Sequence, residues 1–146
     1  MRHVVVVGAG QAGFSFVSRL RNLGFDGLIT LIGGEPVPPY QRPPLSKKYL
    51  LGEMSLERLY FRPLKFYEEQ NINLRLGEDV TAVNALKKII NIGEEIISYD
   101  ELVFTTGSNP RYLPAELGGE LGGVYVIRNL SDVDNIVKEF KIDKHI

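Results

Sequence analysis

Residues 4–13 read Val-Val-Val-Val-Gly-Ala-Gly-Gln-Ala-Gly, and this stretch decides the fold. Four valines are too few for a helix, and their β-branched side chains favour a strand buried on both faces of a parallel sheet. The strand breaks directly into the pattern Gly8-x-Gly10-x-x-Gly13. In such a turn the first glycine permits a tight bend, the second lets the backbone approach a pyrophosphate, and the third lets a helix pack closely. We therefore expect the first half of a nucleotide-binding βαβ unit.

A helix is expected directly after the glycine turn. Its apolar residues recur at helical spacing, at Phe14, Val17, Leu20 and Leu23. Arg19, Arg21 and Asn22 are expected to face solvent. Gly24 then provides the left-handed residue with which helices commonly end. The N-terminus of this helix would offer unpaired N–H groups and a partial positive charge to a phosphate.

The second half of the unit follows in register. Residues 28–32, Leu-Ile-Thr-Leu-Ile, predict a second strand, and Glu35 lies about twenty residues past the last glycine of the turn. A carboxylate at this place accepts hydrogen bonds from adenosine ribose hydroxyls and disfavours a 2′-phosphate. The alternative is a loop with a solvated glutamate. The combined pattern favours an adenine dinucleotide, NAD or FAD.

Composition limits the remaining possibilities. The 146 residues suffice for one domain, and 17 basic against 18 acidic residues give a net charge of −1. We therefore expect no general attraction to nucleic acid or to an anionic membrane. Because no apolar run approaches the eighteen or so residues that span a bilayer, the simplest interpretation is a cytoplasmic protein.

The chain contains no cysteine and only two histidines, His3 and His145. This composition excludes a disulfide, a redox-active dithiol and a cysteine-based metal site within the 146 residues. His3 is expected simply to open the first strand, and no metal cluster is expected. Redox chemistry here would have to come from a cofactor.

Residues 35–47, Glu-Pro-Val-Pro-Pro-Tyr-Gln-Arg-Pro-Pro-Leu-Ser-Lys, contain five prolines and form a stiff, extended segment. One alternative is a disordered linker or a ligand for an SH3-type domain. The position directly after the nucleotide unit favours instead a rigid loop that presents Arg42 and Lys47 to a pyrophosphate. A short helix is expected over residues 45–51, ending at Gly52.

The rest of the chain predicts an α/β fold: a Rossmann-like parallel sheet with the glycine-rich βαβ unit and a small antiparallel β-meander. Two helices are expected: one over 63–70 that starts at Pro63, and one through Phe140 that is opened by a capping box of Ser131 and Asp134. The parallel sheet is expected to gain strands over 73–76 and 102–106, and the meander is expected to consist of strands 80–83, 88–92 and 95–98. A further strand is expected over 124–127.

Four motifs then occur in a familiar order. They are Gly-Ala-Gly-Gln-Ala-Gly at 8–13, Pro-Tyr-Gln-Arg-Pro-Pro-Leu-Ser-Lys at 39–47, Tyr-Asp-Glu-Leu-Val-Phe-Thr-Thr-Gly-Ser-Asn-Pro-Arg at 99–111 and Val-Ile-Arg-Asn-Leu-Ser-Asp at 126–132. With these motifs the chain resembles the flavoprotein ferredoxin reductases, a group within the pyridine nucleotide-disulphide oxidoreductases that includes putidaredoxin reductase and apoptosis-inducing-factor-like proteins. The second motif is the most specific.

The resemblance implies that this segment binds FAD. The implied cofactor-binding residues are Gly8, Gly10, Ala12, Gly13, Glu35, Arg42, Lys47, Val80, Thr106, Gly107 and Arg128. By the same resemblance, the glycine turn and Ala12 hold the pyrophosphate, Glu35 binds the adenosine ribose, and the backbone of Val80 meets the adenine. Lys47 lies near the flavin ring, and the backbone at Gly107 passes beside the cofactor. No catalytic side chain and no metal ligand is implied.

Alternatives and departures accompany these assignments. Arg42 is otherwise a solvated loop cation, and Arg128 is otherwise a partner of Asp132 or Asp134 at a helix start. Similar proteins often carry an acid at the position of Gly34, as well as or instead of Glu35, so Glu35 acts alone here or ribose recognition is weaker. Many also have Ala-Thr-Gly where this chain has Thr-Thr-Gly at 105–107.

The resemblance also predicts an organisation in two parts. Residues 1–110 would be the first segment of an FAD-binding domain, and residues 111–146 would lead into a truncated NAD(H)-binding domain, with a strand opening at 144–146. The whole protein would pass electrons from NAD(P)H through FAD to a ferredoxin-type iron–sulfur protein, and the fragment alone would be inactive. The alternatives are a non-catalytic nucleotide-binding module, or an NADH-binding flavin subunit of the nitrite reductase or disulfide reductase type.

Overall fold

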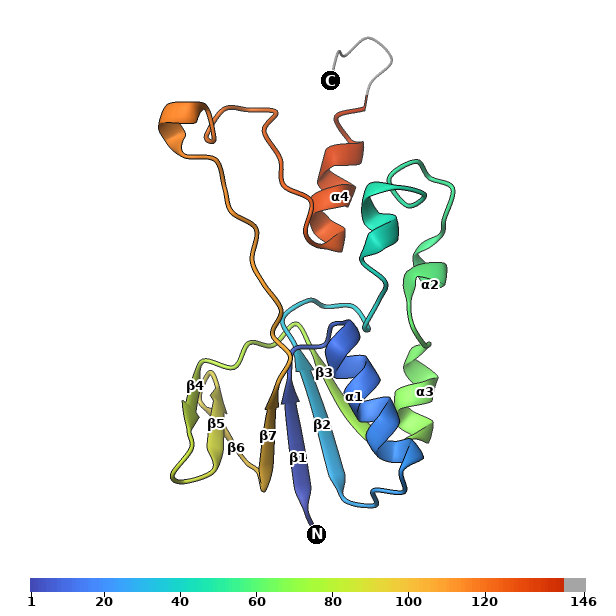
Figure 1. Cartoon of the computed structure of the whole chain (residues 1–146), viewed down its shortest axis with the longest axis vertical. Helices are drawn as coiled ribbons and strands as arrows, with labels where there is room; N and C mark the ends of the chain where they lie inside the picture. The colour runs from blue at the N-terminus through green and yellow to red at the C-terminus, as the bar shows by residue number, and fades with distance from the viewer. Residues whose placement is uncertain (141–146) are drawn as a thin grey trace. The chain divides into compact units, whose positions relative to one another are not determined.

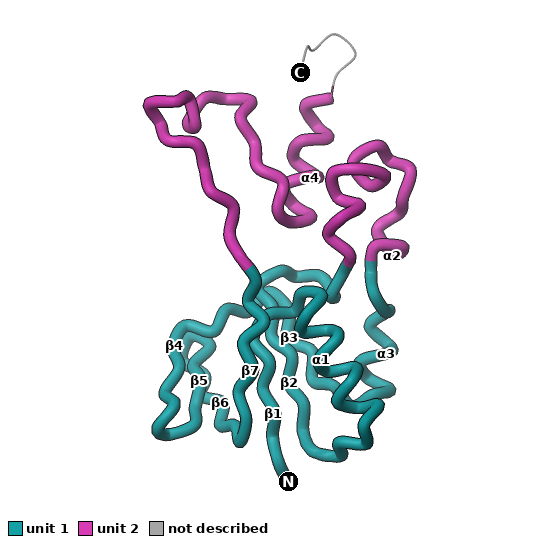
Figure 2. The backbone as a smooth tube through the Cα atoms, in the orientation of Figure 1, with its two compact units in different colours: residues 1–40, 60–107 teal, residues 41–59, 108–146 magenta. Residues whose placement is uncertain are grey.

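The computed structural model describes residues 1–140 of the chain. The chain divides into two compact units, which Figure 2 distinguishes by colour. Unit 1 comprises residues 1–40 and 60–107, and unit 2 comprises residues 41–59 and the chain from 108 onwards. The strand expected at 144–146 and His145 lie outside the described residues.

Unit 1 is built on a parallel sheet of four strands in the order β3-β2-β1-β7 (Figure 1). The strands are β1 (His3–Val7), β2 (Leu28–Gly33), β3 (Ile72–Leu76) and β7 (Glu101–Phe104). In register, Val5 of β1 lies opposite Thr30 of β2 on one side and Leu102 of β7 on the other. The sequence-based expectation of a Rossmann-like parallel sheet is confirmed.

A separate antiparallel sheet forms the predicted meander. It consists of β4 (Ala82–Asn84), β5 (Ile89–Ile92) and β6 (Glu95–Ser98), in the order β4-β5-β6. The first of these strands starts two residues later than expected, because Val80 and Thr81 still belong to the connection from β3.

The alternation of side chains along β1 gives unit 1 its layers. One face of the parallel sheet packs against α1 (Gln11–Asn22) and α3 (Leu64–Glu69), and its buried side chains are Val4, Val6, Val17, Ile29, Leu31, Tyr67 and Ile72. The opposite face packs against the meander, with Val5, Ile32 and Ile90 buried. Because both faces are covered, Val4, Val5 and Val6 are buried and Val7 is half-buried, as suits a central parallel strand.

Helix α1 ends as the sequence predicts. Gly24 has a φ of +82°, its N–H donates to the carbonyl of Arg21, and the N–H of Phe25 donates to the carbonyl of Leu20. This is the Schellman arrangement, in which a left-handed glycine lets the chain satisfy the last carbonyls of a helix.

The expectation that Arg21 faces solvent is wrong. Its guanidinium donates to four backbone carbonyls at 2.6–2.8 Å, those of Phe25, Gly27, Gln70 and Asn71. Arg21 therefore fastens the end of α1 to the start of β2 and to the end of α3. Helical periodicity places a residue on a face, but it does not show that neighbouring loops bring carbonyls to that face.

Unit 2 contains short helices joined by turns. They are a 3₁₀ helix at Pro43–Ser46, α2 (Leu56–Leu59), a 3₁₀ helix at Ala115–Leu117 and α4 (Leu130–Val137). The helix expected over 45–51 is wrong in its bounds: the helical part is the 3₁₀ turn, and separate turns continue to Gly52, whose φ is +72°. Proline at the first positions of that turn starts it two residues before the expected helix.

Three further expectations need correction. Helix α4 does have a capping box, but its members are Asn129 and Asp132 rather than Ser131 and Asp134. Pro63 caps α3 with an extended backbone instead of forming its first helical residue. Residues 124–127 form no strand. The apolar residues at 124–127 are not sufficient to form a strand, because the part of the chain that the structure describes offers no strand with which they pair.

Candidate functional site: a dinucleotide cradle

Gly8 bends the chain sharply at the end of β1. Its φ is +113°, a value that other residues rarely adopt, and its N–H donates to the carbonyl of Ile32 at 2.8 Å. A Cβ added at Gly8 would lie 2.5 Å from the carbonyl carbon of Thr105 and 2.8 Å from the nitrogen of Thr106. This position is closed by backbone, so glycine is a requirement of the fold itself.

Gly13 is closed in the same way. A Cβ there would run into the carbonyl oxygen of Gly8 and would lie 3.0 Å from Thr105 Oγ1 and 3.1 Å from Leu31 Cδ1. The hydroxyl of Thr105 in turn donates to the Gly8 carbonyl at 2.7 Å. Sequence reasoning missed this role of Thr105. The sequence feature that could have revealed this role is Thr-Thr-Gly in place of Ala-Thr-Gly at 105–107, because threonine adds a hydroxyl that alanine lacks.

Gly10 differs from its two neighbours in the pattern. A Cβ added there would have no atom within 4 Å. Gly10 is the N-cap residue of α1, no side chain caps the helix, and Ala12 in its first turn is exposed. The first N–H groups of a helix have no acceptor within that helix. Gly10 therefore borders open space at the positive end of α1, which is the environment a phosphate needs.

Glu35 follows β2 and is held by a neighbour that sequence reasoning did not assign to the site. The phenol of Tyr40 donates to Glu35 Oε2 at 2.6 Å, and Tyr40 is only 4% exposed. A buried tyrosine within the proline-rich segment thus orients the carboxylate. Pro38 and Pro39 are buried too, which excludes the alternative of a disordered linker for residues 36–40. The signal in the sequence was the aromatic residue between prolines.

The connection after β3 brings Val80 to the same end of the sheet. The N–H of Gly77 donates to the carbonyl of Glu35 at 3.0 Å, and the N–H of Glu78 donates to the carbonyl of Gly33 at 3.1 Å. The side chain of Val80 packs on the meander-side core of the sheet. Two backbone hydrogen bonds therefore tie the approach to Val80 to the turn that carries Glu35.

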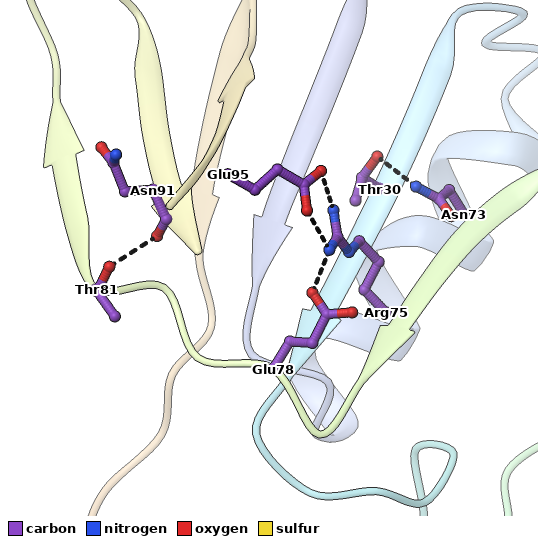
Figure 3. A network of polar contacts seen from close by, with 7 residues as sticks. All are labelled: Thr30, Asn73, Arg75, Glu78, Thr81, Asn91 and Glu95. Carbon is purple, nitrogen blue, oxygen red and sulfur yellow. Dashed lines mark hydrogen bonds and ion pairs between the residues drawn. The ribbon is translucent and has the colours of Figure 1, made fainter. Parts of the chain in front are cut away.

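An ion-pair network fixes this connection, as Figure 3 shows. Arg75 on β3 makes two hydrogen bonds of 2.7 Å to the carboxylate of Glu95 on β6 and a 2.5 Å ion pair with Glu78. The hydrogen bond from Arg75 holds the pKa of Glu95 below its usual value, and the two carboxylates raise the pKa of Arg75. The network joins the two sheets of unit 1 beside the connection to Val80.

The last predicted residues of unit 1 follow β7. Phe104 lies opposite Val7 in register, the N–H of Thr105 donates to the Val7 carbonyl at 2.8 Å, and Gly107 has a φ of +72°. The structure thus brings eight predicted residues to the carboxyl ends of the parallel strands: Gly8, Gly10, Ala12, Gly13, Glu35, Val80, Thr106 and Gly107. In open α/β sheets this edge is where nucleotides bind.

The remaining predicted residues, Arg42, Lys47 and Arg128, belong to unit 2. Arg42 Nη1 donates to the backbone carbonyl of Arg128 at 2.6 Å, and the N–H of Arg128 donates to Asp132 at 2.8 Å. Arg42 is therefore engaged in structure and not simply a solvated loop cation. Arg128 contacts Asp132 through its backbone N–H. Lys47 is exposed directly after the 3₁₀ helix.

Among residues 1–140, no three His, Cys, Asp or Glu side chains are grouped so as to hold a metal ion. None of the helices in the described part of the chain is long and apolar enough to cross a membrane.

The parallel sheet, the glycine turn and the acid after β2 define a Rossmann-type dinucleotide-binding protein. The sequence pattern of the pyridine nucleotide-disulphide oxidoreductases matches residues 2–146, so the chain belongs to that family.

Known relatives are similar over nearly the whole chain. Rhodocoxin reductase of Rhodococcus erythropolis is 39% identical over 134 residues, which are 91% of this chain and 31% of that protein. Putidaredoxin reductase of Pseudomonas putida is 37% identical over 147 residues, 99% of this chain and 35% of its own length. The resemblance to the ferredoxin reductases is thereby confirmed. The chain spans about a third of the length of the curated relatives it matches.

The fold is similar to solved structures as well. The covalent complex of putidaredoxin reductase with putidaredoxin matches with a TM-score of 0.90 at 38% identity, over 97% of this chain and 35% of the other. A ferredoxin reductase for the CYP199A2 system of Rhodopseudomonas palustris matches with a TM-score of 0.87 at 33% identity, over 95% and 34%.

Proposed function

We propose that this chain is the FAD-binding part of a flavoprotein reductase that passes electrons from NAD(P)H through FAD to a ferredoxin-type iron–sulfur protein. One observation carries the proposal: the glycine turn is closed by backbone at Gly8 and Gly13 but open at Gly10. The fold thus needs two of the three glycines, whereas only a ligand needs the third. The named relatives, reductases of rhodocoxin and putidaredoxin, support the reaction class.

Each predicted residue has a part in this proposal. The N–H groups at the start of α1, with Gly10 and Ala12, bind the pyrophosphate, while Glu35 accepts from the adenosine ribose. The backbone of Val80 meets the adenine, and Thr106 and Gly107 pass beside the cofactor.

The cations of unit 2 complete the proposed set. Arg42, Lys47 and Arg128 are further FAD contacts, with Lys47 near the flavin ring. When bound, FAD supplies the exchange of a hydride for single electrons. These residues bind and orient the cofactor, and none of them is needed as an acid or base.

The whole-protein activity rests on the relatives and extends beyond these 146 residues. We propose residues 1–110 as the first segment of the FAD-binding domain and residues 111–146 as the connection into an NAD(H)-binding domain. The complex of putidaredoxin reductase with putidaredoxin supports an iron–sulfur protein as partner. We place the protein in the cytoplasm. We expect no nucleic-acid partner, in keeping with the net charge of −1.

Reconstitution with FAD tests the proposal. The purified chain is titrated with FAD, and binding is followed by the quenching of flavin fluorescence. Gly10→Ala should weaken binding about tenfold or more, because its methyl group enters the space of the pyrophosphate and forfeits hydrogen bonds. Gly122→Ala is the matched control, since it also adds a methyl group in open space. A chain that binds NAD but not FAD would instead support the alternative of a non-catalytic nucleotide-binding module.

A further inference from the structure

A second carboxylate, that of Asp79 on the connection after β3, lies against the turn that carries Glu35. A Cβ added at Gly34 would lie 2.5 Å from Asp79 Oδ1, 3.4 Å from its Cγ and 3.7 Å from its Oδ2. The Asp79 carboxylate therefore occupies the space into which a side chain at position 34 would project. Gly34 and Glu35 directly follow the last residue of β2, where an acid that binds ribose is expected.

Asp79 is held at this place by its neighbours in sequence. On its N-terminal side, Gly77 and Glu78 donate backbone hydrogen bonds to the carbonyls of Glu35 and Gly33, and Glu78 is paired with Arg75. On its C-terminal side, the N–H of Thr81 donates to the carbonyl of Asn91 at 2.8 Å. The backbone on both sides of Asp79 is fixed, while the residue itself is exposed. Its carboxylate thus faces the solvent side of the turn.

We propose that Asp79 is a second specificity-determining residue for the adenosine ribose, acting with Glu35; this rests on the proposed function. An adenosine ribose within a dinucleotide offers two neighbouring hydroxyl donors, and two carboxylates can accept from both. Two negative charges at one place also repel a 2′-phosphate more strongly than one. Asp79, on the connection after β3, then fills the space that a side chain at Gly34 would take.

Nucleotide binding provides the test, with ADP as the probe for the adenosine half of FAD. The affinities of the wild-type chain and of Asp79→Ala are measured by calorimetry for ADP, 2′-deoxy-ADP and 3′-deoxy-ADP. We expect Asp79→Ala to bind ADP roughly three- to tenfold more weakly and to lose most of the preference for ADP over one of the deoxy analogues. Glu94→Ala, which removes an exposed carboxylate from the β5–β6 turn, should change neither quantity.

A rescue variant separates the role of the carboxylate from a role in folding. Gly34 has no positive φ, so Gly34→Asp combined with Asp79→Ala adds an acid without backbone strain and into the space that Asp79 vacates. This double variant should regain the preference for ADP. If Asp79→Ala keeps the full preference of the wild type, or if the double variant does not regain it, the inference fails while the proposed function stands. If the wild type binds neither FAD nor ADP, both fail.

Discussion

At the scale of single residues, the three glycines of one pattern obey different constraints. Gly8 and Gly13 are closed by neighbouring backbone, whereas Gly10 borders open space. The spacing of the glycines predicted all three positions, because the turn is local in sequence. It could not show the hydroxyl of Thr105 that fastens the turn, because that contact joins residues 97 apart in the chain. The sequence therefore predicts features that depend on neighbouring residues, such as the glycine turn, but not contacts between distant strands of the sheet.

Tyr40 offers a test of how Glu35 is oriented. Its phenol donates to the Glu35 carboxylate at 2.6 Å, and a hydrogen bond to a charged group is worth about 1.5–3 kcal/mol. We expect Tyr40→Phe to weaken FAD binding about tenfold, because Glu35, the residue that we propose to bind the ribose, loses a partner that orients its carboxylate. FAD titration of the purified variant measures the change.

The control for this experiment is Tyr112→Phe, which removes a phenol oxygen from a side chain that is 72% exposed. It should leave FAD affinity unchanged. Thermal unfolding of both variants shows whether the Tyr40 effect reflects lost folding. An FAD affinity equal to that of the wild type in Tyr40→Phe would show that Glu35 does not need Tyr40 to position it.

At the scale of elements, the sequence predicted strands better than short helices. The central strands β1 and β2 are mostly buried and almost wholly apolar, whereas β3 and β7 are only partly buried and carry polar residues; all four strands were expected. Helix α2 was not expected, and it has only four residues, too few for a periodicity. The capping box was misplaced by two residues, because Ser131 and Asn129 both suit a cap and only the fold selects between them.

The network of Arg75 joins two elements, β3 and β6, and predicts a dependence of stability on pH. The hydrogen bonds from Arg75 lower the pKa of Glu95 in the folded chain from the ordinary value of 4.5. Glu95 therefore stabilises the fold above its unfolded pKa, and this contribution is lost as pH falls through the lower folded pKa. We expect Glu95→Gln to have a slightly lower urea midpoint than the wild type at pH 7. This difference in midpoint should shrink as the pH falls below about 4.5.

Its neighbour Glu94 supplies the control for this pH series. Glu94→Gln makes the same change of charge one residue away, in the turn before β6, and leaves the pair of Arg75 with Glu95 intact. The midpoint of Glu94→Gln relative to wild type should stay constant between pH 7 and pH 3. A Glu95→Gln difference that is equally constant with pH would show that the ion pair contributes nothing to the folded state.

At the scale of the whole molecule, nucleotide sites can be counted from the sequence. The 146 residues contain one Gly-x-Gly-x-x-Gly pattern, at 8–13, and they span about a third of the length of their curated relatives. Electron transfer from NAD(P)H requires a nicotinamide held against the flavin, which is a second binding task. One turn of this kind accounts for one dinucleotide.

We therefore expect the chain, when reconstituted with FAD, to oxidise NADH no faster than an equal concentration of free FAD. The rate is measured as loss of NADH absorbance with ferricyanide as the acceptor, and putidaredoxin reductase of full length serves as the positive control. FAD binding without NADH oxidation would show that these residues bind the cofactor but do not by themselves support hydride transfer. Turnover well above free FAD would instead require these residues to hold the nicotinamide as well, and one glycine turn would then serve both nucleotides.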